Sequence, residues 1–181
     1  MHGVVFSSFR DYVTATYGRD VTQQVFAGSG AYLLSEAYPD EEFVGLVSRA
    51  VEVTQTDAEE LVHDFGVFTA QTTFARLYPA FFAISPTARD FLLTVETRIH
   101  ELVRATIPNA QPPQLHVSER GEDGVSIVYT SPRRLCVLLR GLVEGTARHY
   151  GETAAITEST CAKHGDDACT FEITLRSAPT A

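Results

Sequence analysis

A pair of prolines, Pro112-Pro113, divides this 181-residue chain into two parts with different hydrophobic patterns. Before the pair, apolar residues recur every three or four positions in several segments, which predicts amphipathic helices. After the pair, short stretches have the composition of strands, and one helical pattern follows Pro132. The strand-like stretches are 115–117, 125–129, 154–160 and 170–175. The sequence therefore predicts an α+β fold, with a helical N-terminal lobe and a C-terminal lobe of antiparallel sheet plus helices.

Composition favours one domain that spans residues 1–181. A hydrophobic fraction of 44% suffices for a core that also encloses a cofactor, and no linker or repeat separates the lobes. The formal charge of −9 argues against a nucleic-acid surface. No apolar run is long enough to span a membrane and no signal peptide is visible, so we expect a cytoplasmic protein. The tail from residue 177 is expected to be disordered.

One predicted helix carries a histidine, His100, among apolar neighbours. Ser85-Pro86 has the form of an N-cap followed by a first-turn proline, and helical periodicity continues to residue 106. On this helix His100 shares its surroundings with Val103 and Ile107 rather than with the charged face. A lone histidine in such a place is often a hydrogen-bonded core residue, so His100 needs further evidence before it is assigned a function.

A second motif, Tyr-x-Ser-x-Arg, ends the second strand-like stretch at Tyr129, Ser131 and Arg133. Residues two apart share one face of an extended chain, so these three polar groups are expected to converge. A phenol, a hydroxyl and a guanidinium together suit carboxylates, and Arg133 can bind one bidentately. A histidine ligand combined with a carboxylate clamp suggests heme, with iron on His100 and the propionates on the clamp. By itself the motif also arises by chance in many exposed strands.

The order of these motifs resembles the heme nitric oxide/oxygen binding (H-NOX) family over nearly the whole chain. The matching segments are MHGVVFSSFRDYV, FARLYPAFF, the His100 helix followed twelve residues later by Pro-Pro, YTSPR, and RGLVEGTARHY. The resemblance implies heme b between the two lobes, with residues 1–60 as a distal helical subdomain and 61–181 as a proximal subdomain. It also implies specific roles: His100 as the proximal iron ligand, Tyr129, Ser131 and Arg133 as propionate partners, and Pro113 packed against the porphyrin.

Residues of the first helix and of the helix after Pro132 are candidates for the heme pocket. By the resemblance the opening segment covers the distal side, so Val5 and Phe9 either touch the heme or pack only against other helices. In oxygen-binding relatives, a tyrosine on the later helix donates a hydrogen bond to the bound oxygen. Leu138 is the best match for that position here.

An apolar wall at Leu138 predicts a nitric oxide sensor that discriminates against oxygen, because bound oxygen gains more than nitric oxide from a hydrogen-bond donor. Stable oxygen binding would instead require a hydrogen-bond donor from another part of the chain. Tyr12 and the region of Gln71 are the candidates for such a donor.

The three cysteines of the chain form a second constellation with one histidine. Cys136 is joined by Cys161-x-x-His164-x4-Cys169, and three thiolates with an imidazole are a typical closed zinc set. The clustering favours a metal site over disulfides in a reducing cytoplasm. Some H-NOX members are similar here, with a cysteine where this chain has His164. A thiol redox switch, with a disulfide between Cys161 and Cys169, is the other interpretation.

The resemblance implies a sensor and not an enzyme. Nitric oxide would bind ferrous heme opposite His100, weaken the iron–histidine bond and let the two lobes rotate. The signal would pass to a separate partner, such as a histidine kinase or a cyclic-di-GMP enzyme, as in a bacterial stand-alone member of the family. Two alternatives remain: a heme-free, zinc-stabilised module for another small apolar molecule, and an enzyme that uses an open metal position. The first has some support, since the segment 161–169 resembles that of 4-vinyl reductase-type ligand-binding domains.

Overall fold

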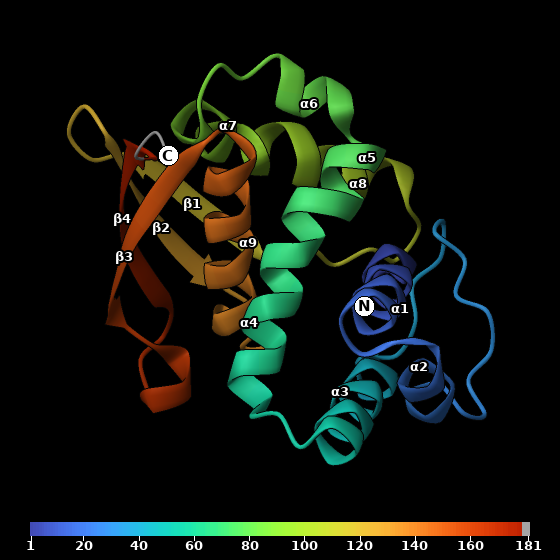
Figure 1. The fold of residues 1–181 in the computed structure, drawn as a ribbon. Coiled ribbons are helices and arrows are strands. Elements are labelled where there is room, and N and C mark those ends of the chain that lie inside the picture. The colour runs from blue at the N-terminus through green and yellow to red at the C-terminus, as the bar shows by residue number, and fades with distance from the viewer. Residues whose placement is uncertain (179–181) are drawn as a thin grey trace.

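Helix α9 (Cys136–His149) lies between a four-stranded sheet and helix α4 (Ala58–Phe68), as Figure 1 shows. The structure is a computed structural model that describes residues 1–178. The two helices cross closely because Gly66 and Gly141 carry no side chains at the crossing. A Cβ atom on Gly141 would lie 2.0 Å from the carbonyl oxygen of His63, so only glycine fits this contact. This crossing joins the helical lobe to the sheet.

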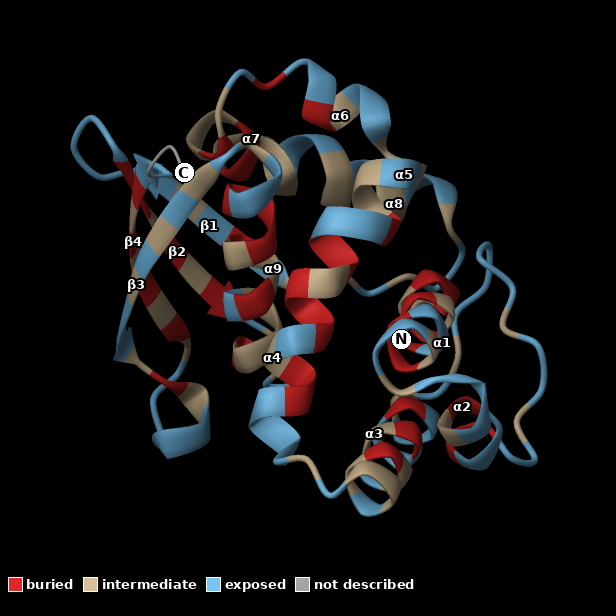
Figure 2. Ribbon diagram, in the orientation of Figure 1, coloured by how far each residue is buried: buried red, intermediate tan, exposed pale blue. Residues whose placement is uncertain are grey.

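The sheet is antiparallel throughout, with the strand order β1-β2-β4-β3. Buried and less buried residues alternate along β2 and β4, as the colours in Figure 2 show, which is the pattern of strands with one face in the core. The strands are β1 (Gln114–Glu119), β2 (Gly124–Thr130), β3 (Glu152–Thr160) and β4 (Cys169–Ser177). A short 3-10 turn, η3 (Ala162–His164), lies between β3 and β4. Strand β4 includes Ser177, which pairs with Glu152, so the chain is still ordered where the predicted tail begins.

The N-terminal lobe is built on helices with a phenylalanine-rich core. Its helices are α1 (Gly3–Tyr17), α2 (Arg19–Val25) and α3 (Asp40–Thr54), which pack with α4. Phe9 is fully buried at the centre, where its ring meets those of Phe43 and Phe65 at 5.4 and 5.1 Å between centroids. Such edge-to-face pairs add to the hydrophobic stabilisation of the core.

Between α4 and the sheet, the chain forms two series of short helical segments. The first series continues α4: π-helix η1 (Thr69–Phe74), α5 (Ala75–Leu77) and α6 (Pro79–Ala83). The second series is α7 (Ala88–Thr94), π-helix η2 (Val95–His100) and α8 (Glu101–Thr106). The predicted single helix from Ser85-Pro86 is therefore three consecutive segments. It begins at Ala88, because the hydroxyl of Thr87 accepts a hydrogen bond from the Asp90 amide at 3.1 Å and caps the first turn.

The α+β class and the two-lobe arrangement are confirmed. The helix predicted to start at Pro132 begins four residues later, at Cys136. None of the helices in residues 1–178 combines the length and the apolar character that a membrane crossing requires. Residues 179–181 of the predicted tail lie outside the described part of the chain.

Candidate functional site

A cavity of about 230 Å³ is lined by side chains from both lobes. Its walls are mainly apolar and come from segments that are far apart in the sequence. They include Val4 and Val5 of α1, Phe65 of α4, Leu92 of α7, Ile99 of η2, Ile127 of β2, and Leu138, Leu139, Leu142 and Val143 of α9. A hollow apolar space of this kind is typical of a site for a small ligand or a cofactor.

His100 lines this cavity at the end of π-helix η2. Its Nδ1 lies 2.8 Å from Oε2 of Glu96, and its side chain is only 16% exposed. Burial lowers the pKa of His100 in spite of the nearby carboxylate, which favours the neutral imidazole. The pKa of Glu96 is also lowered: burial raises it, but hydrogen bonds from Arg104, His100 and the Leu115 amide outweigh burial. An ionised carboxylate only accepts, so Nδ1 carries the proton and Nε2 keeps its lone pair for a metal.

The three residues of the Tyr-x-Ser-x-Arg motif all line the same cavity. Strand β2 ends at Thr130, however, so only Tyr129 lies in the strand, and the turn that follows places Ser131 and Arg133. The Tyr129 hydroxyl accepts a hydrogen bond from the Leu135 amide at 3.1 Å, and burial raises its pKa. The convergence is as expected, but a turn rather than the alternation of an extended chain produces it.

Arg133 connects the cavity to the N-terminal lobe. Its Nη1 donates to the Gln111 carbonyl at 2.6 Å, and its Nε lies 2.8 Å from Oδ2 of Asp40. The second contact is an ion pair without hydrogen-bond alignment, so the buried Nε has no hydrogen-bond partner among residues 1–178. Asp40, the first residue of α3, also accepts from the Met1 amino group at 2.6 Å. The guanidinium therefore retains donor capacity for a carboxylate that enters the cavity.

Of the four predicted pocket residues, Pro113, Val5 and Leu138 line the cavity. Phe9 is placed differently. It lies in the phenylalanine core of the N-terminal lobe and is absent from the cavity wall formed by the described residues. Val5 and Phe9 share a helix face, but Phe9 is one turn farther along α1 and points into the core between α3 and α4.

A threonine that the sequence reasoning missed, Thr69 in η1, lines the cavity, and its hydroxyl group is hydrogen-bonded. It lies 2.8 Å from the hydroxyl of Ser8, which itself donates to Thr73 at 2.8 Å. Because a serine hydroxyl has one proton, Thr69 must be the donor to Ser8. The two residues that the sequence offered as hydrogen-bond donors to bound oxygen lie elsewhere. Tyr12 is buried in the N-terminal core, and Gln71 is exposed. The available signal was helical spacing, since Ser8 lies four residues from Val4 and Tyr12, and Thr69 lies four residues from Thr73.

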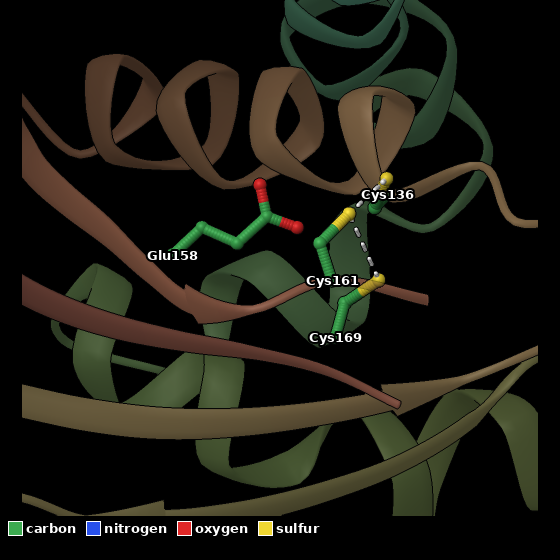
Figure 3. Close-up of side chains that lie close together, drawn as sticks. All are labelled: Cys136, Glu158, Cys161 and Cys169. Carbon is green, nitrogen blue, oxygen red and sulfur yellow. Dashed lines mark hydrogen bonds between the residues drawn. The ribbon is translucent and has the colours of Figure 1, made fainter. Parts of the chain in front are cut away.

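The three cysteines meet at the other side of α9 from α4, where Figure 3 shows their sulfur atoms converging. The Sγ atom of Cys161 lies 3.9 Å from those of Cys136 and Cys169. Oxygen of Glu158 completes a group of four ligand atoms that all lie within 4.8 Å of one another. Burial raises the pKa of Cys136 to about 12 and also raises that of Cys169, so these thiols need a cation to become thiolates.

His164, the predicted fourth ligand, lies outside this group. It is exposed on the η3 turn, where its backbone amide bonds to the Cys161 carbonyl at 2.8 Å. Glu158 takes its place because β3 has an irregularity between Glu158 and Thr160, which changes the direction of side chains near the end of the strand. The structure thus brings the three cysteines together and places Glu158, rather than His164, beside them.

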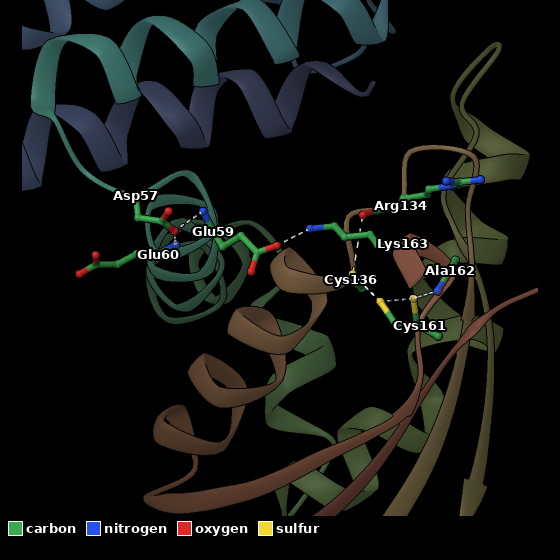
Figure 4. A network of polar contacts seen from close by, with 9 residues as sticks. Asp57, Glu59, Glu60, Arg134, Cys136, Cys161, Ala162 and Lys163 are labelled. Carbon is green, nitrogen blue, oxygen red and sulfur yellow. Dashed lines mark hydrogen bonds and ion pairs between the residues drawn. The ribbon is translucent and has the colours of Figure 1, made fainter. Parts of the chain in front are cut away.

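The loop that carries Cys161 also contacts the helical lobe. Nζ of Lys163, the only lysine in the chain, lies 2.9 Å from Oε1 of Glu59 at the start of α4 (Figure 4). Asp57 caps the same helix by accepting from the amides of Glu59 and Glu60. The loop after Cys161 is therefore linked to α4 by this ion pair, and the cluster includes the first residue of α9, Cys136.

The model of the family described as Haem-NO-binding matches residues 2–158. The chain belongs to this family, whose H-NOX domains bind heme and act as gas sensors. Two curated relatives are similar in sequence, each with 24% identity over 165 residues. The match to soluble guanylate cyclase gcy-35 of Caenorhabditis elegans covers 86% of this chain and 24% of that protein. The match to soluble guanylate cyclase 89Da of Drosophila melanogaster covers 83% of this chain and 23% of that protein.

Solved structures show the same fold. An H-NOX protein from S. oneidensis in the Fe(II)NO state superposes with a TM-score of 0.89 at 23% identity, covering 98% of this chain and all of that one. The unliganded Fe(II) H-NOX protein from K. algicida gives a TM-score of 0.85 at 22% identity, with full coverage of both chains. The chain spans about a quarter of the curated cyclases and the whole of these two solved H-NOX structures.

Proposed function

We propose that this chain is a heme-based sensor that binds nitric oxide at ferrous heme b, discriminates against oxygen and signals to a separate protein. The observation that carries the proposal is the environment of His100. A neutral imidazole lines an apolar cavity with its Nδ1 fixed on Glu96, which leaves Nε2 for iron. Heme, when bound, would supply the iron that takes the gas.

The other cavity residues fit the cofactor. A heme has a broad apolar ring and two carboxylates at one edge. The cavity walls are likewise mainly apolar, with the polar residues Tyr129, Ser131 and Arg133 in one part of them. Arg133 has a buried Nε that is ion-paired with Asp40 but makes no hydrogen bond among residues 1–178, and Tyr129 and Ser131 lie near it in sequence and in the cavity wall. These three residues would hold the propionates, while Val5, Pro113 and Leu138 would contact the apolar ring.

Two features support discrimination against oxygen. Leu138, which lines the cavity from α9, has no hydrogen to donate. The Thr69 hydroxyl, also in the wall, already donates its single proton to Ser8. Nitric oxide needs little help from a donor, whereas bound oxygen gains from one. Leu138 and Thr69 thus favour nitric oxide over oxygen.

The output would begin at His100. Helix η2 is continuous with α7 and α8, and Glu96 in η2 is bonded to Leu115 in β1, so displacement of His100 would move both lobes relative to each other. A partner such as a histidine kinase or a cyclic-di-GMP enzyme would read this movement. We expect the chain to act as a sensor and not as a catalyst, in the cytoplasm, where its three free cysteines would stay reduced.

The cysteine cluster is proposed as a structural zinc site. Cys136, Cys161 and Cys169 would bind as thiolates, and Glu158 would be the fourth ligand instead of His164. Four protein ligands close the coordination sphere, which leaves no position for a substrate. Zinc content should fall in Glu158→Ala and stay stoichiometric in His164→Ala; the reverse result would restore the histidine.

The absorption spectrum of the purified ferrous protein, with and without nitric oxide and in air, tests the sensor function. We expect a heme band that shifts with nitric oxide, does not change in air and is lost or altered in His100→Ala. A stable oxygen complex would retain heme sensing and overturn the selectivity. No heme uptake, even after reconstitution, would favour the heme-free binding module, which would use the same apolar cavity.

A further inference from the structure

The carboxylate of Glu96 accepts hydrogen bonds from three different residues. Its Oε2 accepts from Nδ1 of His100 at 2.8 Å and from the backbone amide of Leu115 at 3.1 Å. Its Oε1 accepts from the guanidinium of Arg104. The side chain of Glu96 is 22% exposed, so these contacts are partly shielded from water. One carboxylate therefore joins the histidine, the next helix and the first strand.

The backbone around Glu96 fits this arrangement. Glu96 and His100 lie four positions apart within π-helix η2, so both side chains are on one side of the segment. π-Helical turns are often found at functional sites. Arg104 lies eight residues after Glu96 on α8 and holds the other carboxylate oxygen, and Leu115 is the second residue of β1. The carboxylate cannot rotate without losing at least one of these three partners.

We propose that Glu96 is a positioning residue that strengthens the bond between His100 and the heme iron and couples that bond to strand β1. This proposal rests on the proposed heme function. A carboxylate that accepts from Nδ1–H fixes the tautomer and the ring plane, and it increases the basicity of Nε2. Glu96 would therefore set how readily nitric oxide releases His100. Because the same oxygen holds Leu115, the sheet would respond when His100 moves.

The test compares heme-loaded Glu96→Gln and Glu96→Ala with the wild-type protein. The main readout is the iron–histidine stretching frequency of the unliganded ferrous protein, measured by resonance Raman spectroscopy. We expect the frequency to fall in Glu96→Gln, whose amide oxygen still accepts but carries no charge, and to fall further in Glu96→Ala. The midpoint potential of the heme should rise in the same order, because a less basic imidazole stabilises ferric iron less. Heme affinity should fall by about tenfold in Glu96→Ala.

Two controls separate positioning from general stability. Glu101→Gln removes an exposed carboxylate next to His100 and should leave the frequency and the potential unchanged. Arg104→Gln keeps the carboxylate but removes its second anchor, and a smaller frequency change in the same direction is expected. It also provides a test if Glu96→Ala does not fold. Nitric oxide should release His100 in a larger share of molecules in each variant whose frequency falls.

The outcomes distinguish this inference from the sensor function itself. Absence of heme in the wild-type protein, or a His100→Ala spectrum identical to wild type, would refute the sensor function. If heme binds through His100 but Glu96→Gln and Arg104→Gln both keep the wild-type frequency and potential, the positioning role alone is overturned. A loss of thermal stability without a frequency change has the same meaning, since it would show that Glu96 only supports the fold.

Discussion

The cavity and the cysteine cluster share helix α9 but differ in how their polar groups are arranged. The cavity has one imidazole, that of His100, beside a hollow apolar space, and its Nε2 is available to bind a metal. The cluster brings four ligand atoms within 4.8 Å of one another. A single ligand beside open space suits a cofactor that exchanges a small molecule, whereas four convergent ligands suit an ion that is kept. The first arrangement fits the proposed sensor function, and the second fits the proposed structural zinc site.

The largest expected effect follows removal of one cysteine, which should affect only the cluster. In Cys161→Ala, zinc content should fall to near zero, and the free energy of unfolding should decrease by about 4 kcal/mol, because metal binding contributes to folding. Elemental analysis and urea unfolding measure both quantities, with exposed His164→Ala as the matched control. Cys161→Ala with full zinc occupancy would contradict the assignment, and an altered heme spectrum would show that the two sites are coupled.

A change at the crossing of α4 and α9 should disturb both sites. Gly141→Ala places a methyl group 2.0 Å from the His63 carbonyl, so the helices must separate. We expect a loss of about 2–3 kcal/mol in urea unfolding and weaker retention of both heme and zinc. Gly45→Ala is the control: it lies in helix α3 with open space around its Cα and should stabilise the protein by about 0.5–1 kcal/mol. Equal stabilities of the two variants would refute the close crossing.

A third change affects only the cavity and concerns its gas selectivity. Ser8→Ala removes the acceptor of the Thr69 proton, so that hydroxyl becomes free to donate to a ligand in the cavity. Oxygen affinity should rise about fivefold, which corresponds to about 1 kcal/mol for one hydrogen bond, while nitric oxide binding changes little. Oxygen titration of the ferrous protein measures this, with Ser7→Ala as the neighbouring control. The same oxygen affinity in both variants would mean that the Thr69 proton does not control selectivity.

Sequence spacing identified the cavity residues better than it identified the cluster. His100 and the Tyr129 motif could be proposed from the residue patterns, and Pro113 from the resemblance to the H-NOX family; all of them line the cavity. Glu158 could not be predicted as a ligand-forming neighbour of the cysteines. Its position depends on an irregularity that shifts the register of β3 against β4, and no residue type in the sequence indicates that irregularity.

Contacts between distant segments were also beyond the sequence. The bond between Ser8 and Thr69 joins residues 61 positions apart, and the bond between Glu96 and the Leu115 amide joins a helix to a strand. The spacing of Glu96 and His100 was visible in the sequence, but the partners that fix the carboxylate were not. Phe9 was a pocket candidate, together with Val5, through the family resemblance, but its ring packs between those of Phe43 in α3 and Phe65 in α4, in the core.

The smallest expected effect concerns the ion pair that joins the cavity residue Arg133 to the N-terminal lobe. Burial raises the pKa of Asp40, but the Met1 amino group and Arg133 outweigh burial, so the pKa lies below its ordinary value of 3.8. A lowered carboxyl pKa contributes stability that is fully present above pH 3.8 and is lost as the pH falls through the folded value. Because the Asp40 side chain is 38% exposed, solvent screening limits this contribution to less than about 1 kcal/mol.

Asp40→Asn should therefore be slightly less stable than the wild type near pH 6, and the difference should shrink as the pH falls below 3.8. Urea unfolding at several pH values measures the difference, and Asp167→Asn, at an exposed turn, is the control. A difference that stays constant down to pH 3 would mean that the carboxylate charge is not what stabilises this contact. If heme loading removes the difference at pH 6, the propionates compete with Asp40 for Arg133, and the cavity then controls how tightly the two lobes are joined.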